Sequence, residues 1–474
     1  MSETMEKRSE TAENPLGTQP IGKLLVKYSV PSIIALLVNS LYNIVDQVYI
    51  GNFVGELGNA ATNIAYPLTI LVISLALLFG LGGAAGFNLS LGKGDKEAAP
   101  YYLGNSAVML AICGVVIMVI TLLFLTPLLK AFGSPDDVLP YAQSYVGITA
   151  FGFPFYLFSA GCGHLIRADG RPRASMTCNL VGAIINVGLD TLFVAVLGYG
   201  IRGAALATII GQIVAAMVAL WYMFHVQTVE LKRKHLRPQI EYIGQSARLG
   251  MAPCFNQLAT MVVQITMNNS LRFFGGMSIY GEAIPIAVVG IITKVSMIYL
   301  SIIGGVGQAM QPISSFNYGA KKYDRVRSVV LRSFRFGLIV GVIAFLMFQI
   351  FPLQIISLFG EGSSQVYYDF AVRYFRIYLF FAFANFLPIM GSNFFTAIGK
   401  PIRGTILSLT RQIIFFLPLL LIFPRIFPIL FGVDGIDGIL YVGPVADALA
   451  ITVGLVMVVR ELRDLRRQMQ ELET

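Results

Sequence analysis

Long apolar stretches recur from one end of the chain to the other. Most run for about 20 residues or more, which is enough for an α-helix to cross the hydrocarbon core of a bilayer. Hydrophobic residues occupy 56% of the 474 positions and charged residues only 12%, about half the charged share of a soluble domain. The stretches are continuous, whereas the strands of a membrane β-barrel alternate apolar with polar residues. The chain is therefore predicted to be an all-α polytopic membrane protein.

Periodicity and the Gly-, Pro- and charge-rich connections predict twelve transmembrane helices. In the first half they are expected near residues 22–50, 60–91, 100–126, 138–166, 174–197 and 203–226. In the second half they are expected near residues 248–273, 284–313, 332–357, 365–397, 403–430 and 437–460.

The two halves resemble one another in sequence. "AFGSPDDV" (131–138) recurs as "LFGEGSSQV" (358–366), and "ADGRPRAS" (168–175) recurs as "AIGKPIRG" (397–404). Six spans per half is an even number, so both halves enter the membrane in the same sense and would be related by a pseudo-twofold axis along the membrane normal. The predicted divisions are a disordered cytoplasmic N-terminus (1–21), an N-lobe (22–226), a cytoplasmic linker (227–247), a C-lobe (248–460) and a cytoplasmic amphipathic tail (461–474).

The distribution of Lys and Arg predicts the orientation. The N-terminal stretch, the even-numbered connections and the C-terminal tail carry 26 of the 34 basic residues, whereas the odd-numbered connections carry four. Basic residues accumulate on the cytoplasmic side, so both termini are expected in the cytoplasm. The net charge of +9 reflects this asymmetry and does not indicate binding to nucleic acid.

Several polar residues lie within the predicted spans at a similar depth. Asp46 and Thr208 lie about five residues from the outer ends of their helices and Asp190 about eight, which corresponds to roughly 8–12 Å. Asn186 precedes Asp190 by four residues, so the two share a helix face. A charged group in hydrocarbon costs at least a few kcal/mol, and the shared depth therefore favours a functional site.

Two carboxylates in such a pocket repel each other, and burial disfavours the charged form of each. The pair is suited to sharing a proton. The same oxygens, together with an amide and a hydroxyl, also suit a small hard cation. The plainer interpretation is that each Asp faces a water-filled vestibule or caps a local bend.

Five motifs occur in order along residues 22–460: "PSIIALLVNSLYNIVDQVYIG", "GLGGAAGFNLSLGKGD", "IRADGRPRASM", "NVGLD" and "GIRGAALATIIGQ". In combination they resemble the multidrug and toxic compound extrusion (MATE) transporters, in the MepA-like or DinF-like branch. The resemblance implies a secondary antiporter that expels lipophilic organic cations from the cytoplasm by alternating access, coupled to H⁺ or Na⁺. It also implies a monomer in contact with membrane lipid, with no cofactor beyond the coupling ion.

The same resemblance implies which residues couple the ion. In this branch the site lies in the N-lobe, and residue by residue it falls here on Asp46, Asn186, Asp190, Thr208 and Tyr145. The first four of these would also be the ligands of Na⁺. Pro31 matches the proline at which the first helix bends in the family. A proline inside a helix removes one backbone hydrogen bond and so provides a hinge.

The C-lobe embeds a different set of charges, namely Lys294, Arg411 and Asp447. The plainer interpretation is a structural ion pair between Asp447 and one of the two bases, and the alternative is a role in gating or substrate binding. The seventh span contains amides but no carboxylate. A C-lobe cation site like that of the other bacterial MATE branch is therefore not expected.

Two other functions are weighed against efflux. A flippase for a lipid-linked precursor would share the two-lobed fold, but a more cationic cavity is expected for it. A membrane-embedded enzyme would need a catalytic cluster, and the sequence has no HExxH motif and only three histidines. It also lacks the phosphate-binding G-x-x-x-x-G-K-[ST] loop of ATP-driven machines. The chain is not expected to be an enzyme.

Overall fold

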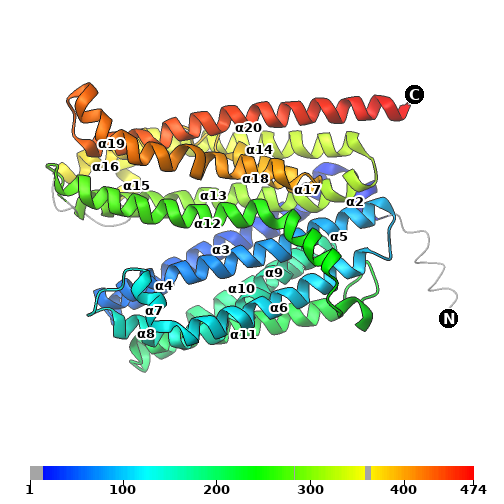
Figure 1. The fold of residues 1–474 in the computed structure, drawn as a ribbon, viewed down its shortest axis with the longest axis horizontal. Helices are drawn as coiled ribbons and strands as arrows, with labels where there is room; N and C mark the ends of the chain where they lie inside the picture. Colours follow the sequence, from blue (N-terminus) through cyan, green and yellow to red (C-terminus); the bar gives the residue numbers. More distant parts are fainter. Residues whose placement is uncertain (1–13, 282, 358–364, 474) are drawn as a thin grey trace.

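The computed structural model describes residues 14–281, 283–357 and 365–473, and the regular structure of these residues is entirely helical (Figure 1). The first half contains α2 (Pro15–Thr18), α3 (Ile21–Phe53), α4 (Glu56–Leu75), α5 (Gly82–Lys93), α6 (Ala99–Leu123), α7 (Leu125–Ala131), α8 (Leu139–Thr149), α9 (Phe153–Ala168), α10 (Pro172–Asp190) and α11 (Gly200–Phe224). The second half contains α12 (Ile240–Gly276), α13 (Ala283–Gly319), α14 (Tyr323–Ile350), α15 (Pro352–Ser357), α16 (Gln365–Tyr378), α17 (Phe386–Ala397), α18 (Pro401–Leu409), α19 (Leu417–Phe431) and α20 (Gly435–Glu473).

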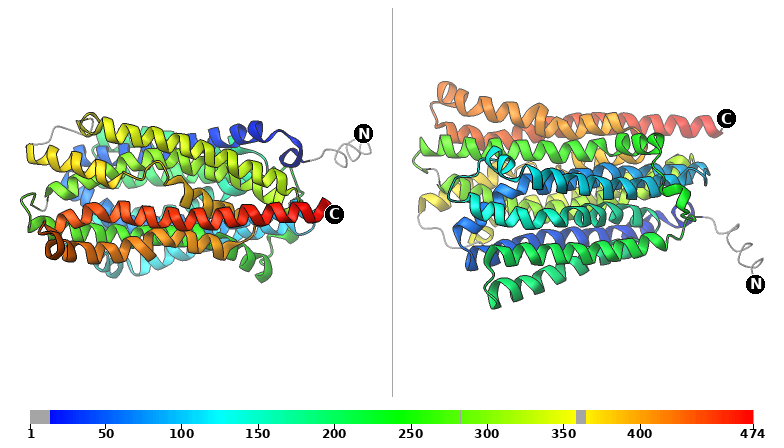
Figure 2. Two further views of the ribbon diagram at one scale, coloured as in Figure 1. Left: turned by 90° about the horizontal axis from the view of Figure 1, so that it is seen from above. Right: turned by 60° about the horizontal axis from the view of Figure 1, so that its bottom comes forward.

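The helices run along the long axis of the molecule in two groups, one for each half of the sequence (Figures 1 and 2). The short helix α2 and the last turns of α20 lie at the same end, which we call the termini end. Because the apolar stretches do form long helices, the predicted all-α polytopic membrane protein is confirmed.

Ten helical segments of the described residues are long and apolar enough to cross a membrane. The two remaining predicted spans differ for identifiable reasons. The helix α12 is 37 residues long, but it carries many amide and hydroxyl side chains, which lower its hydropathy. The span predicted at 365–397 is divided into α16 and α17 by a non-helical break at residues 379–385, so neither piece reaches the length of a full span.

Corresponding helices of the two halves are interrupted, although the π-helical segments begin at different positions, 19 residues after Pro172 and nine residues after Pro401. The helix α10 continues into a π-helical segment, Thr191–Val196, and α18 continues into another, Thr410–Phe416. Likewise α8 and α9 are separated by a short 3₁₀ turn, as α16 and α17 are by their break. This agreement extends the internal repeat from the sequence to the backbone.

The two ends of the chain differ from expectation. Residues 14–20 were expected to be disordered but pack against α13 and α14, because Asn317 and Arg325 donate to the Leu16 carbonyl at 2.9 and 3.2 Å. Residues 1–13 of that predicted disordered segment lie outside the described residues. Residues 461–473 of the expected separate tail (461–474) instead continue α20, since the Glu461 side chain is buried and pairs with Lys400 and Arg403 at the start of α18. Residue 474 lies outside the described residues.

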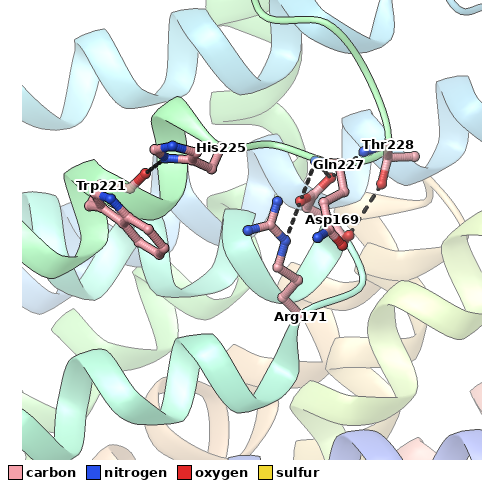
Figure 3. A network of polar contacts seen from close by, with 6 residues as sticks. All are labelled: Asp169, Arg171, Trp221, His225, Gln227 and Thr228. Atoms are coloured by element: carbon pink, nitrogen blue, oxygen red, sulfur yellow. Dashed lines mark hydrogen bonds and ion pairs between the residues drawn. The ribbon is translucent and has the colours of Figure 1, made fainter. Parts of the chain in front are cut away.

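The linker between the halves is fastened to the first half by Asp169 (Figure 3). Its carboxylate accepts hydrogen bonds from the backbone N–H groups of Gln227 and Thr228 at 3.0 and 2.9 Å, and it pairs with Arg171 at 3.3 Å. Burial raises the pKa of the Asp169 carboxyl, and the N–H donors and Arg171 oppose that rise. Further along, the Asn105 amide donates to the carbonyl of the buried His235 at 3.0 Å. The linker therefore follows the first half closely.

The two halves approach most closely near the termini end through glycines. A Cβ on Gly250 of α12 would lie 2.0 Å from the Leu78 carbonyl oxygen, and one on Gly82 would lie 2.0 Å from that of Ser246. A Cβ on Gly92 of α5 would likewise lie 2.0 Å from the Phe316 carbonyl oxygen of α13. Backbone meets backbone at these points, so a side chain here has no room unless the halves separate.

The Asp169→Asn substitution should loosen the linker. An amide accepts with one oxygen only and carries no charge, so it cannot match the carboxylate as a partner of two N–H groups and Arg171. Amide hydrogen exchange at Gln227 and Thr228 should become about tenfold faster, measured by mass spectrometry. The exposed Asp434→Asn substitution serves as a control, and unchanged exchange in Asp169→Asn would refute the anchoring role.

The Gly250→Leu substitution should force the halves apart at the termini end. Spin labels at the exposed positions Lys96 and Asp324, in a background without the four native cysteines, would report the distance between the halves. We expect a longer distance for Gly250→Leu, because the new side chain would overlap the backbone of Leu78 in the first half. Gly244→Leu, on the same helix but with open space around it, should leave the distance unchanged. Equal distances in the two variants would contradict the packing argument.

Candidate functional site

Two carboxyl groups meet in the first half of the molecule, where α3 packs on α10. Asp190 is the last residue of α10, immediately before the π-helical segment, and it is completely buried. Neither of its oxygens has a hydrogen-bond partner among the described residues, and the same holds for the buried Oδ1 of Asp46. The two carboxyl groups are close enough to interact. Because burying a negative charge without a partner is costly, this arrangement favours a proton or a cation that both groups share.

The other predicted coupling residues surround this pair. The Asn186 amide donates to Thr208 Oγ1 at 3.3 Å, and the Thr208 hydroxyl donates to the Ala204 carbonyl at 3.0 Å. The Oδ1 of Asn186 is buried without a hydrogen-bond partner. Tyr145 of α8 lies close to both carboxylates and to Thr208. The structure thus brings all five residues together from four helices.

The side of the site away from the termini is closed by apolar and hydrogen-bonded contacts. Ile50, Val194 and Ala204 form a small buried cluster there. The hydroxyls of Tyr49 and Thr191 lie 2.7 Å apart and connect α3 to the π-helical segment. These contacts hold the outer parts of α3 and α10 together and cover the carboxylates on that side.

On the opposite side the site adjoins a polar cavity of about 50 Å³. Asn186 and Thr208 line both the site and this cavity. The other polar residues that line the cavity are Asn39, Tyr42, Tyr156, Ser159, Asn179 and Gln212. The Oε1 of Gln212 is another buried acceptor without a partner. The cavity is therefore lined with acceptors and hydroxyls that suit a hydrated cation.

Helical spacing could have identified most of these residues. Asn39 and Tyr42 precede Asp46 by seven and four positions, and Asn179 precedes Asn186 by seven. These separations place each residue on the same helix face as the one it precedes. Tyr156 carries no such signal, because its position depends on how α9 is oriented against α3.

Pro31, the predicted hinge, lies in an unbroken part of α3. The proline has no N–H to donate, so the i−4 hydrogen bond at that turn is missing. The neighbouring Ser32 hydroxyl donates to the Tyr28 carbonyl at 2.8 Å. Here α3 is continuous from Ile21 to Phe53, and the missing bond is a weak point at which it could bend.

In the second half the structure pairs Arg411 with Asp447. The Asp447 carboxylate is buried and also accepts from the Asn385 amide at 3.2 Å, while the guanidinium lies over the Phe416 ring at 5.8 Å from its centroid. Lys294 does not join this pair and has no ion pair or hydrogen bond within the described ranges. It lies seven residues before Ser301, on the face of α13 whose Ser301 hydroxyl lies 2.9 Å from that of Ser40 on α3.

The ion pair occupies the repeat equivalent of the polar cavity in the first half. Arg411 is ten residues after Pro401, the start of α18, and Gly182 is ten after Pro172, the start of α10. Asp447 and Gln212 each follow the first residue of α20 and α11 by twelve positions. Asn385 and Tyr156 each precede the last residue of α17 and α9 by twelve. All three first-half equivalents line the cavity.

The donors of the first-half site are carboxylate, amide and hydroxyl oxygens. No group of three or more His, Cys, Asp or Glu that could hold a metal ion occurs in the part of the chain that the structure describes. Oxygen donors of this kind suit hard monovalent or divalent cations and not soft transition metals. The residues therefore fit a proton or Na⁺.

Comparisons with known proteins agree with this architecture. The sequence profile of the MatE family matches residues 31–192 and 258–422. The multidrug export protein MepA of Staphylococcus saprophyticus is 23% identical over 423 residues, covering 88% of each chain. The FAD transporter of Shewanella oneidensis is 22% identical over 443 residues, covering 91% of this chain and 92% of its own.

Among solved structures, an outward-facing multidrug resistance MATE family transporter of the MOP superfamily has a similar fold. It superposes with a TM-score of 0.87 at 22% identity, covering 95% of this chain and 98% of the other. The similarity confirms the predicted fold of twelve transmembrane helices.

Removing one member of the C-lobe ion pair should destabilise the protein more than removing both. Asp447→Leu leaves the Arg411 guanidinium without its counter-charge and should lower the free energy of unfolding by about 3 kcal/mol, whereas Arg411→Met with Asp447→Leu should restore most of this. The measurement is thermal unfolding of the purified protein in detergent. If the double variant is as unstable as Asp447→Leu alone, the loss of stability does not come from an Arg411 charge left without its counter-charge, and the argument is contradicted.

Proposed function

The chain belongs to the MatE family of multi-pass membrane transporters, and from this premise we propose that it expels lipophilic organic cations in exchange for H⁺ or Na⁺. The observation that carries the proposal is the completely buried carboxyl group of Asp190, which lies beside the buried Oδ1 of Asp46 with no hydrogen-bond partner for either group among the described residues. Buried carboxylates without a counter-ion are costly, so a chain that keeps two of them on adjacent helices needs a cation there during its cycle.

The coupling cation acts on the contact between α3 and α10. Without it, the two carboxylates repel each other across the helix contact, and the Asn186, Thr208 and Tyr145 dipoles only partly offset the repulsion. A proton or Na⁺ removes the repulsion and draws the helices together. The missing hydrogen bond at Pro31 lets the inner part of α3 bend in response.

Drug and ion compete because they stabilise different states of the same helices. An organic cation bound between the two halves neutralises the site when the coupling ion is absent. When the coupling ion arrives, it weakens the binding of the organic cation. Exchange then follows from linkage between the two binding equilibria, with no need for direct contact. The polar cavity beside Asn186 and Thr208 adjoins the carboxylates and offers polar groups to a hydrated ion.

Orientation follows from the charges and the packing. Basic residues concentrate on the side of the chain termini, which we assign to the cytoplasm, in the inner membrane of a bacterium. The glycine contacts of Gly82, Gly92 and Gly250 close the two halves at that same end. The halves are therefore closed on the side that we assign to the cytoplasm, and we propose that the protein acts as a monomer, since each chain contains both halves.

The flippase alternative is less well supported by the charges near the site. The first-half cavity is lined by amides and hydroxyls and adjoins two acids. A phosphate-bearing lipid precursor would be repelled there.

The Asp190→Asn substitution should abolish coupled export. Ethidium efflux from proteoliposomes should fall by about tenfold or more, because the amide keeps the side-chain volume but can neither release a proton nor neutralise a cation. Proton and sodium gradients are imposed separately, and the gradient that drives the wild type identifies the coupling ion.

The exposed Asp136→Asn substitution is the matched control for loss of one acid, and it should export like the wild type. Export by Asp190→Asn at the wild-type rate, under the same gradient, would show that the buried carboxylate is structural and that the proposed mechanism is wrong.

A further inference from the structure

A basic groove lies where α20 leaves the bilayer at the termini end. It encloses about 390 Å³ and is lined by Arg403, Met457, Arg460, Arg463, Asp464 and Arg467. Four of the six lining residues are arginines and one is acidic. None of Arg460, Arg463 and Arg467 has a carboxylate within ion-pair distance in the described part of the chain. The groove therefore carries uncompensated positive charge.

The groove is held in a fixed shape. Glu461 of α20 is completely buried and pairs with Lys400 and Arg403, which ties α20 to the beginning of α18. Leu465, one turn further on, is also completely buried. The arginines consequently project from a helix whose other face is packed, and they are not on a free tail.

The depth of the groove matches the lipid headgroups. Arg460 follows Gly435, the first residue of α20 at the opposite end of the molecule (Figure 1), by 25 residues, or about 38 Å of helix. A bilayer has a hydrocarbon core of about 30 Å and spans about 40 Å with its headgroups. Arg460 is also the first charged residue of α20 after Asp447. The arginines thus begin at the level of the phosphates.

Apolar surface continues from the groove into the bilayer. Ile402 and Ile406 of α18 and Leu455 and Val456 of α20 are exposed, and Met457 forms the apolar part of the groove lining. A ligand that places an anion among the arginines could lay acyl chains along these side chains. A free anion would not use this second surface.

We propose that this groove binds the headgroup phosphate of an anionic phospholipid. Arginine is the side chain best suited to the task, because its planar guanidinium donates two parallel hydrogen bonds to phosphate oxygens. Basic pockets beside transmembrane helices are attractive to anionic lipids in general. The bound lipid would fasten α18 and α20 of the second half to one leaflet while the first half moves against it.

The test compares two variants that lose the same charge. Arg460→Gln with Arg467→Gln removes two groove arginines, and Arg327→Gln with Arg466→Gln removes two exposed arginines of the same end that do not line it. Each full-length protein is equilibrated in mixed micelles with equal amounts of phosphatidylglycerol and phosphatidylcholine. Native mass spectrometry then counts the lipids that stay bound.

The wild type and the Arg327/Arg466 variant should retain phosphatidylglycerol in preference to phosphatidylcholine, and the Arg460/Arg467 variant should retain about tenfold less of it. Equal retention by the two variants would overturn the proposal, because lipid binding would then depend only on the overall positive charge of the termini end. A separate arm adds inorganic phosphate alone. Displacement of phosphatidylglycerol by millimolar phosphate would identify a free-anion site and would also overturn the assignment to lipid.

Discussion

Charge buried in the membrane needs a counter-charge, and this constraint organises the molecule. In the first half, Asp190 is completely buried, and neither its oxygens nor the buried Oδ1 of the neighbouring Asp46 has a hydrogen-bond partner among the described residues. In the second half, Asp447 is equally buried but has Arg411. The two halves share a backbone plan in which corresponding helices are interrupted, yet they meet the constraint in opposite ways. One half supplies its cation from its own sequence, and in the proposed function the other takes one from outside.

The repeat makes this asymmetry specific. Arg411, Asp447 and Asn385 stand at the positions equivalent to Gly182, Gln212 and Tyr156, which line the cavity of the first half. An arginine in place of a glycine fills the space that is left open as a cavity in the other half. We infer that the second half is the rigid partner in exchange and that the coupling ion acts on the first half alone.

Much of this could be predicted from the sequence because apolar length and helical depth are local properties. Continuous apolar stretches identified the helices, and equal depth brought Asp46, Asp190 and Thr208 together. Other features depend on tertiary contacts. In the sequence alone, residues 14–20 resemble a polar tail. Their packing depends on the hydrogen bonds that Asn317 and Arg325 donate to the Leu16 carbonyl. The division of the tenth span at residues 379–385 and the contribution of Tyr156 to the cavity depend on packing between helices distant in sequence. Lys294, like Arg411 and Asp447, lies in an apolar stretch of the sequence. In the structure it lies on the face of α13 that carries Ser301, and it does not join the Arg411–Asp447 ion pair.

The most direct measurement is the release of the coupling cation when drug binds to the purified protein. Ethidium is added to the wild type and to a variant with both Asp46→Asn and Asp190→Asn, while a pH-sensitive dye follows released protons and ²²Na⁺ follows released sodium. The account predicts that the wild type releases one of these cations on binding ethidium and that the variant releases neither. Release from the variant equal to that of the wild type would contradict the claim that these two carboxylates hold the ion.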